Sequence, residues 1–332
     1  MPGLLLRVLA GTIGIGFAAI GFAAGPAAAQ ADYPRRAITV IVPFAAGGPT
    51  DVVARIVGEH MSRTLGQQII IQNVSGAGGT VGSTRGMRAD PDGYTLLMGQ
   101  MGTHAAAVAL YPNLAYKPEV DFAPIGMAAG TPILILGKKD FPPKDLKEFI
   151  AYVKANETKL NQAHAGVASV SHVTCLLLNS LIGVKPTAVP FGGTGPAMNA
   201  LVGGQVDYMC DQIVNVVSQV QGGTIKGYAI ATTERNPSLP NVPTTREAGL
   251  PEFQVSAWNA LFAPKATPKP IVDKLSDALD KALDDENTRK RLLELGSDLP
   301  EKPRRGQAAL AALVKSEIAR WTPVIQAAGP MN

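Results

Sequence analysis

Residues 37–50 of the chain read AITVIVPFAAGGPT, and this stretch indicates the class of fold. Residues 37–42 are a β-branched apolar run, which predicts a buried strand. Residues 43–50 form a turn rich in glycine and proline, after which apolar side chains recur at helical spacing from Val52 to Leu65. A strand, a glycine-rich loop and a helix in this order predict one unit of an α/β fold.

The same alternation continues along the chain, so we expect largely parallel sheets. Expected strands cover 68–72, 94–98, 132–136, 185–190, 205–210 and 227–231, and expected helices cover 143–156, 268–284, 286–295 and 304–328. We expect two lobes, with lobe 1 at 32–130, lobe 2 at 131–235 and a return to lobe 1 at 236–332. The chain would cross between the lobes near 128–131 and 232–243, and the cleft between such lobes is a natural ligand site.

Composition excludes several classes of protein. The chain has 332 residues, of which 46% are hydrophobic and 17% charged, as in ordinary globular proteins. Its net charge of +4 comes without a basic run, so no nucleic-acid partner is expected. The sequence lacks the fingerprints of nucleotide loops, serine-nucleophile elbows and zinc proteases. The four histidines lack metal-ligand spacing, so we expect neither metal nor cofactor; they are His60, His104, His164 and His172.

Residues 1–31 have the pattern of a secretory signal peptide. Arg7 is the single charge, an apolar stretch follows from Val8 to Ala24, and small residues offer cleavage after Ala29 or Ala31. An uncleaved membrane anchor is the alternative, but the apolar stretch is short and rich in glycine and alanine. We therefore expect a mature protein in the periplasm.

Export affects the expected redox state of the two cysteines. Cys175 and Cys210 would lie in an oxidising compartment, where neighbouring thiols usually pair. Both segments look like core elements of one lobe, so we expect a disulfide that closes a loop of about 35 residues. The alternative is two separate buried thiols.

Five glycine-rich turns precede expected helices, and they suggest a site for an anion. Backbone N–H groups at a helix start attract negative charge, and glycine lets the backbone approach a ligand closely. Ser, Thr and His side chains in these turns add donors. The turns are 44–50, 76–80, 102–104, 166–172 and 191–196.

Three charged or reactive residues in or beside these turns have simpler interpretations. An acidic side chain beside an anion site would repel the ligand, so we expect Asp51 to cap its own helix. Ser171 and His172 could act as nucleophile and base in a secreted hydrolase. Because they are so close in sequence, we instead expect them to cap and line a helix start.

With these residues in view, the chain resembles the extracytoplasmic substrate-binding proteins of tripartite tricarboxylate transporters, the Bug family. The resemblance covers nearly all of the mature chain. It is carried by Pro43 to Arg55 (PFAAGGPTDVVAR), Gly76 to Gly79 (GAGG), Asp92 to Leu96 (DGYTL), Gly166 to His172 (GVASVSH) and Gly203 to Asp207 (GGQVD).

The resemblance implies a type II periplasmic-binding-protein fold that closes on a small organic acid, without catalysis. In the first lobe, it implies ligand contacts from Phe44, Ala45, Ala46, Gly47, Gly48, Gly78, Gly79, Thr103 and His104. In the second lobe, it implies contacts from Ser169, His172, Phe191, Gly192, Gly193 and Thr194, with Asp211 after the strand that faces the cleft.

One departure from the family pattern concerns the charge of the ligand. Where relatives often carry an aromatic-basic pair before glycine, this chain has Phe191-Gly192-Gly193. The missing cation weakens the case for a tricarboxylate and favours a mono- or dicarboxylate, aromatic ones included. We expect a monomeric receptor that delivers this ligand to membrane permease subunits. A sensor that reports occupancy to a membrane kinase is the alternative.

Overall fold

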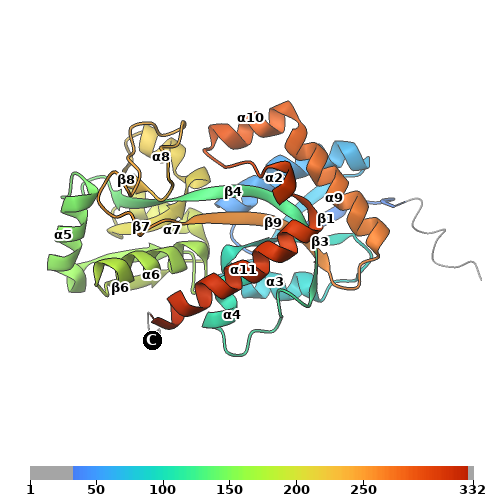
Figure 1. The fold of residues 1–332 in the computed structure, drawn as a ribbon, viewed down its shortest axis with the longest axis horizontal. Helices are drawn as coiled ribbons and strands as arrows, with labels where there is room; N and C mark the ends of the chain where they lie inside the picture. The colour runs from blue at the N-terminus through green and yellow to red at the C-terminus, as the bar shows by residue number, and fades with distance from the viewer. Residues whose placement is uncertain (1–32, 328–332) are drawn as a thin grey trace, which may run out of the picture. The chain divides into compact units, whose positions relative to one another are not determined.

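A computed structural model describes residues 33–327, in which strands and helices alternate along most of the chain (Figure 1). The predicted signal peptide lies outside the described residues. The strands are β1 (Ile38–Val42), β2 (Ile69–Asn73), β3 (Thr95–Gln100), β4 (Phe122–Lys138), β5 (Asn161–His164), β6 (Thr187–Pro190), β7 (Tyr208–Gln212), β8 (Ile225–Ile230) and β9 (Ser256–Pro264). The predicted α/β class is confirmed.

The helices follow the expected pattern, with an additional π-helical turn at Gly102–Ala106. They are α2 (Pro49–Leu65), α3 (Thr80–Met87), α4 (Ala107–Leu110), α5 (Leu146–Asn156), α6 (Val170–Ile182), α7 (Thr194–Val202), α8 (Val217–Gln221), α9 (Lys269–Asp284), α10 (Glu286–Glu294) and α11 (Gly306–Ala327).

Within the described residues, nine strands form one sheet in the order β2-β1-β3-β9-β4-β7-β5-β6, and β8 also pairs with β4. We call β1, β2 and β3 the first arm and β5, β6 and β7 the second arm. Pairing is parallel inside each arm, as predicted. The centre differs from the expectation, because β9 and β4 pair antiparallel with each other and with the strands beside them.

The long strand β4 explains how the two arms share one sheet (Figure 1). Its first part pairs with β9, from Phe122 opposite Pro264 to Pro132 opposite Ser256. Its last part pairs with β7 and β8. Strand β4 passes unbroken through the expected boundary at 130/131, so no break in the strand marks a lobe limit there. The limits of the two lobes stay a prediction.

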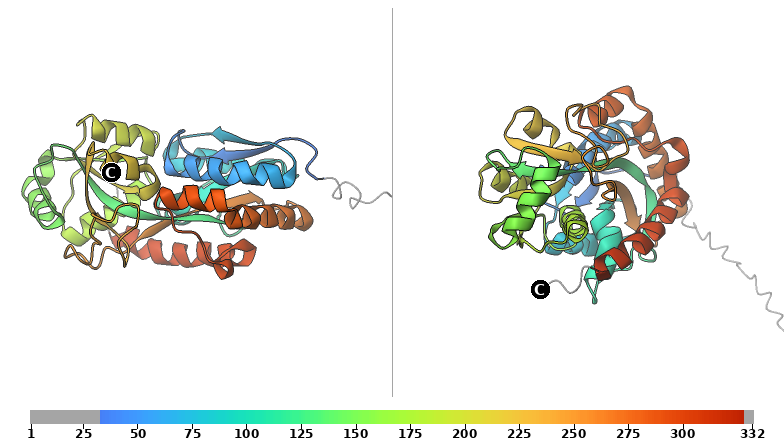
Figure 2. Two further views of the ribbon diagram at one scale, coloured as in Figure 1. Left: turned by 90° about the horizontal axis from the view of Figure 1, so that it is seen from above. Right: turned by 60° about the vertical axis from the view of Figure 1, so that its left-hand side comes forward.

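Helices cover the arms because the apolar faces of the strands must leave water. On one face of the first arm, Gly58 of α2 approaches Ile69 closely, and on the other face Gly86 of α3 approaches Leu97. Helix α2 also packs on α9 and α10, and α11 runs along β4 with Trp321 buried (Figure 2). Residues 33–327 contain no helix that combines the length and apolar character needed to cross a membrane.

The two cysteines lie in the core of the second arm. Cys175 on α6 and Cys210 on β7 are both buried, and their side chains interact with each other. The two thiols are not bonded to each other in the structure, and the disulfide stays a prediction. Burial and the hydrogen bond with Cys175 raise the pKa of the Cys210 thiol well above its usual range.

Candidate functional site

A narrow cavity lies at the carboxyl ends of strands from both arms. Its lining comes from the ends of β3 and β7 and from the loops that follow β1, β5 and β6. All of the lining side chains are uncharged. They are Phe44, Gly48, Pro49, Thr50, Gln100, Ala165, Ser169, Val170, Thr194 and Gln212.

Three helices begin at this cavity: α2 at Pro49, α6 at Val170 and α7 at Thr194. Helices α2 and α7 follow glycines, and neither start receives a side-chain cap from the described residues. The first N–H groups of a helix lack intrahelical partners and carry the positive end of the helix dipole. The cavity therefore combines three partial positive charges with no cationic side chain in its lining, which suits an anion.

Asp51 holds the loop that precedes α2. Its carboxylate accepts hydrogen bonds from the Gly47 N–H at 3.0 Å, from the Arg55 guanidinium at 2.9 Å and from the Asn73 amide at 3.0 Å. Burial alone would raise the pKa of Asp51, but these hydrogen bonds outweigh burial and lower it. The Arg55 guanidinium thus neutralises the charge of Asp51. The hydrogen bond from the Gly47 N–H to Asp51 holds the Phe44–Gly48 loop in place.

Glycines bring the backbones of the two arms into direct contact. A Cβ atom on Gly78, which follows β2, would lie 1.6 Å from the carbonyl oxygen of Val167, which follows β5. A Cβ atom on Gly102 would lie 2.4 Å from the carbonyl oxygen of Ala168. Any side chain at these positions would push the arms apart, so glycine is required for this closed arrangement.

Two further contacts complete the closure. A Cβ atom on Gly193, which precedes α7, would lie 2.9 Å from the Cβ of Ala45. The Tyr111 hydroxyl lies 3.0 Å from the carbonyl oxygens of both Ala77 and Val167, which belong to loops of different arms. The loops of the first and second arms therefore meet over the cavity.

The structure divides the predicted ligand residues into three groups. Cavity-lining residues are Phe44, Gly48, Ser169 and Thr194. Residues at the contacts between arms are Ala45, Ala46, Gly78 and Gly193. The remaining predicted residues do not line the cavity: Gly47, Gly79, Thr103, His104, His172, Phe191, Gly192 and Asp211. Pro49, Thr50 and Val170, from the predicted turns 44–50 and 166–172, also line the cavity. Lining residues that the sequence analysis missed are Gln100, Ala165 and Gln212.

His104 lies beneath the site in an aromatic cluster. Its ring stacks on Phe262 with centroids 4.1 Å apart, and it packs against Phe122 and Tyr116. Its Nδ1 is 2.9 Å from the Thr103 hydroxyl, whereas its buried Nε2 has no hydrogen-bond partner among the described residues. Desolvation lowers the pKa of His104 to about 3, so the ring is neutral and adds no charge to the site.

The start of α6 is built by hydrogen bonds to the backbone. The Ser169 hydroxyl accepts from the His172 N–H at 3.3 Å, and the Ser171 hydroxyl accepts from the Ala165 N–H at 2.9 Å. The Nδ1 atom of His172 accepts from the Ala168 N–H, and its ring packs against His164. Burial, with a smaller contribution from His164, lowers the pKa of His172 to about 4.

Asp211 is fully buried in β7, on the opposite face from its neighbour Gln212. Its carboxylate accepts from the Gln212 N–H at 2.7 Å and from the Asn215 amide at 3.2 Å. Desolvation raises the pKa of Asp211 to about 7, although these hydrogen bonds act in the opposite direction. The group therefore binds its own backbone and does not reach the cavity.

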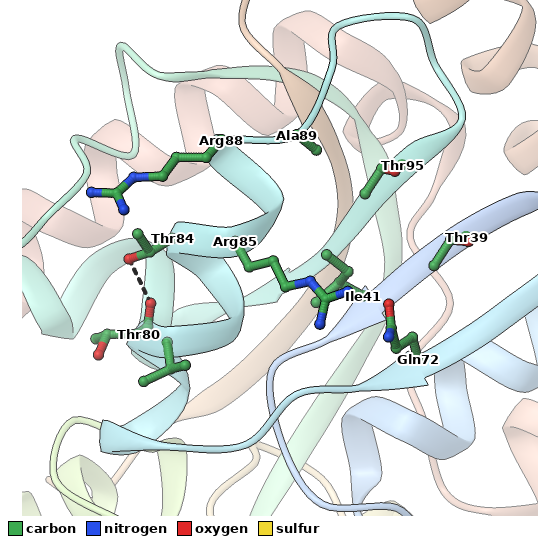
Figure 3. A pocket seen from close by; sticks show the side chains of 10 residues that line it. Thr39, Ile41, Gln72, Thr80, Thr84, Arg85, Arg88, Ala89 and Thr95 are labelled. Carbon is green, nitrogen blue, oxygen red and sulfur yellow. Dashed lines mark hydrogen bonds between the residues drawn. The ribbon is translucent and has the colours of Figure 1, made fainter.

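A second hollow, an open groove, lies on the face of the first arm that α3 covers (Figure 3). Arg85 extends toward Gln72 on β2, while Arg88 points away from the strands (Figure 3). Both arginines are exposed. Because every residue of this groove belongs to the first arm, an occupant would not draw the two arms together. No cluster of potential metal ligands occurs in residues 33–327.

Comparison with known proteins assigns the chain to a family. Residues 53–329 match the family described as tripartite tricarboxylate transporter family receptor. The chain belongs to this family. Its receptors fold into two lobes, so the predicted two-lobed fold is confirmed, with the cavity at the meeting point of the arms.

Three solved structures of the family are similar over most of the chain, each with a TM-score of 0.86. MatC from Rhodopseudomonas palustris, with bound malate, is 56% identical, and the match covers 88% of this chain and all of that one. The periplasmic binding protein BugD is 42% identical, with 90% and 99% covered. Rpa4515 of R. palustris, with adipate, is 30% identical, with 90% and 100% covered.

Proposed function

We propose that this receptor captures a short aliphatic dicarboxylate by closure of its two lobes and delivers it to a membrane permease. The observation that carries the proposal is the cavity at three helix starts, with an entirely uncharged lining. Hydrogen bonds from neutral donors to a carboxylate are charge-assisted and stronger than neutral pairs. A ligand that touches both lobes stabilises the closed state and shifts the population toward it.

The ligand of a similar receptor supports a four-carbon acid. MatC, at 56% identity, holds malate. The uncharged lining offers no cation to balance the third charge of a tricarboxylate. We therefore propose malate or a close relative as the ligand, which narrows the broader range that the sequence suggested.

Several further features complete the proposal. A signal peptide at 1–31 would direct the protein to the periplasm, where the family's binding proteins act. The receptor would act as a monomer without cofactor or metal, and the partners would be permease subunits. The hydrogen bonds of Ser171 and His172 to backbone atoms support binding rather than hydrolysis, because among the described residues no serine hydroxyl there bonds to a histidine ring.

Thermal unfolding against a panel of acids tests the proposed ligand class. The mature protein, unfolded and refolded to remove bound ligand, should melt roughly 10 °C higher with malate or succinate at about 1,000 times the Kd, since binding contributes about 4 kcal/mol there. Adipate, benzoate and citrate should give smaller shifts, and the diamides of malate and succinate none. A shift produced only by neutral or cationic compounds would refute the proposal.

The disulfide remains a prediction, and the contact between the thiols makes it testable. After oxidising export, we expect the mature protein to have an intact mass about 2 Da below that of the reduced protein. The bridge would raise the free energy of unfolding by about 4 kcal/mol in the chain-entropy model. Alkylation of two thiols in the unfolded protein without reductant would contradict this expectation.

A further inference from the structure

Two glutamines form part of the cavity wall, one from each arm. Gln100 is the last residue of β3, and Gln212 is the last residue of β7. Their exposed fractions are 1% and 3%, and both line the cavity. Each is thus a buried polar side chain at the place where the lobes meet.

The carboxamide oxygens of both glutamines are already occupied. Oε1 of Gln100 accepts from the backbone N–H of Gly102. Oε1 of Gln212 accepts from the Thr131 hydroxyl at 2.7 Å and from the Asn259 amide at 3.3 Å. Because the oxygens are engaged, it is the two NH₂ groups that remain for the cavity, and neither has a hydrogen-bond partner among the described residues. Both NH₂ groups are therefore available to donate to an acceptor in the cavity.

Thr131 and Asn259 fix the orientation of Gln212. Thr131 belongs to β4 and Asn259 to β9, the two strands that join the arms, and both side chains are fully buried. The Asn259 amide also lies 3.4 Å from the Thr131 hydroxyl, so the three side chains form a closed triangle of hydrogen bonds. They are positioning residues, because neither Thr131 nor Asn259 lines the cavity.

We propose that the NH₂ groups of Gln100 and Gln212 donate to one carboxylate of the ligand and select it against a carboxamide. This inference rests on the proposed function and names the groups that recognise one end of the acid. A carboxamide of the same shape would direct its own NH₂ group at these donors and leave buried hydrogen bonds unmade, a mismatch that sites built for one polar group reject strongly. Neutral donors achieve this without burying a cation.

Calorimetry with malate and its two monoamides tests the selection. The wild-type protein should bind both monoamides at least 100-fold more weakly than malate. In Gln212→Glu, the new carboxylate repels malate and accepts from an amide. Malate affinity should therefore fall at least 100-fold, and the better monoamide should come within tenfold of malate or exceed it.

Three further variants separate recognition from folding. Gln162→Glu makes the same change at a glutamine that is equally buried but outside the cavity, and it should keep the wild-type preference. Gln212→Met introduces no charge. It should reduce the ratio of the affinities for malate and the better monoamide at least tenfold, even if Gln212→Glu does not fold. Thr131→Val, which releases Gln212, should weaken malate binding about 3- to 10-fold with a smaller loss of preference.

The outcomes distinguish the two proposals. If the wild-type protein binds malate but Gln212→Met and Gln212→Glu keep its preference over the monoamides, the glutamine inference is wrong and the proposed function stands. If the wild-type protein binds neither malate nor any other acid of the panel, the proposed function fails and the inference fails with it.

Discussion

Replacement of Gly78 by alanine should lower the affinity for malate at least 100-fold while leaving the ligand-free protein folded. The added Cβ would lie 1.6 Å from the carbonyl oxygen of Val167 and 2.8 Å from its carbonyl carbon. These atoms are backbone on the opposite lobe, so the overlap is relieved only if the lobes separate. In the open state the ligand loses its contacts with one lobe. The apparent affinity for malate is therefore reduced in proportion to the fraction of the receptor that can still close.

The backbone conformation of Gly78 requires a matched control. Its φ is +61°, a region that costs a residue with a side chain about 1–2 kcal/mol. Gly66, at the end of α2, has a φ of +68°, and no atom lies within 4 Å of the position that a Cβ would take there. Gly66→Ala should therefore lower the ligand-free Tm as much as Gly78→Ala but bind malate normally. Equal malate affinities for the two variants in calorimetry would contradict the role of Gly78 in closure.

The glycine turns can be predicted from sequence because their chemistry is local. Gly78 needs a positive φ and space for an opposing backbone, and both requirements select glycine itself. The start of α2 is equally visible, since Pro49 and the helical spacing after it mark a helix. The sequence alone therefore locates the loops that precede α2 and α3.

The centre of the sheet could not be predicted in the same way. Strand β9 is buried along almost its whole length, so it lacks the alternation that identifies a strand with one face in water. The first part of β4 contains Pro124 and Gly126, which suggest a loop. The structure accommodates them at irregularities in the pairing with β9, where a proline or a glycine is tolerated.

Burial explains the other differences at the site. The strands expected from sequence stop at 98 and 210, which leaves Gln100 and Gln212 outside them, whereas in the structure they are strand ends that line the cavity. His104 follows a glycine in a turn, like a ligand contact, but distant Phe122 and Phe262 enclose it. Only the tertiary fold determines which polar side chains reach the ligand.

These enclosed histidines lead to a prediction about acid stability. The pKa values of His104 and His172 are lowered from 6.5 to about 3 and about 4. The unfolded chain therefore binds protons near pH 6.5 that the folded protein does not. Stability from these groups is fully present above pH 6.5 and is lost as pH falls toward 4, by about 1.4 kcal/mol per pH unit for each histidine.

Asp211 should oppose this loss. Its pKa is raised to about 7, so between pH 4 and 7 the folded protein holds a proton that the unfolded chain has released. Its contribution to stability rises as pH falls, again by about 1.4 kcal/mol per unit. The aspartate therefore offsets one of the two histidines, and the wild-type free energy of unfolding should fall by about 1.4 kcal/mol per unit between pH 6.5 and 4 from these three groups.

Two variants should change the slope of the free energy of unfolding against pH in opposite directions. A general effect of acid on the protein would not do so. His104→Phe places a similar ring in the aromatic cluster and removes one histidine, so the slope should fall by about 1.4 kcal/mol per pH unit. Asp211→Asn removes the opposing group, so the slope should rise by about 1.4 kcal/mol per pH unit. Urea unfolding of the ligand-free protein at intervals from pH 4.5 to 8 measures both. If the two curves run parallel to that of the wild type, then burial does not hold these groups neutral, and the acid sensitivity of the fold has another origin.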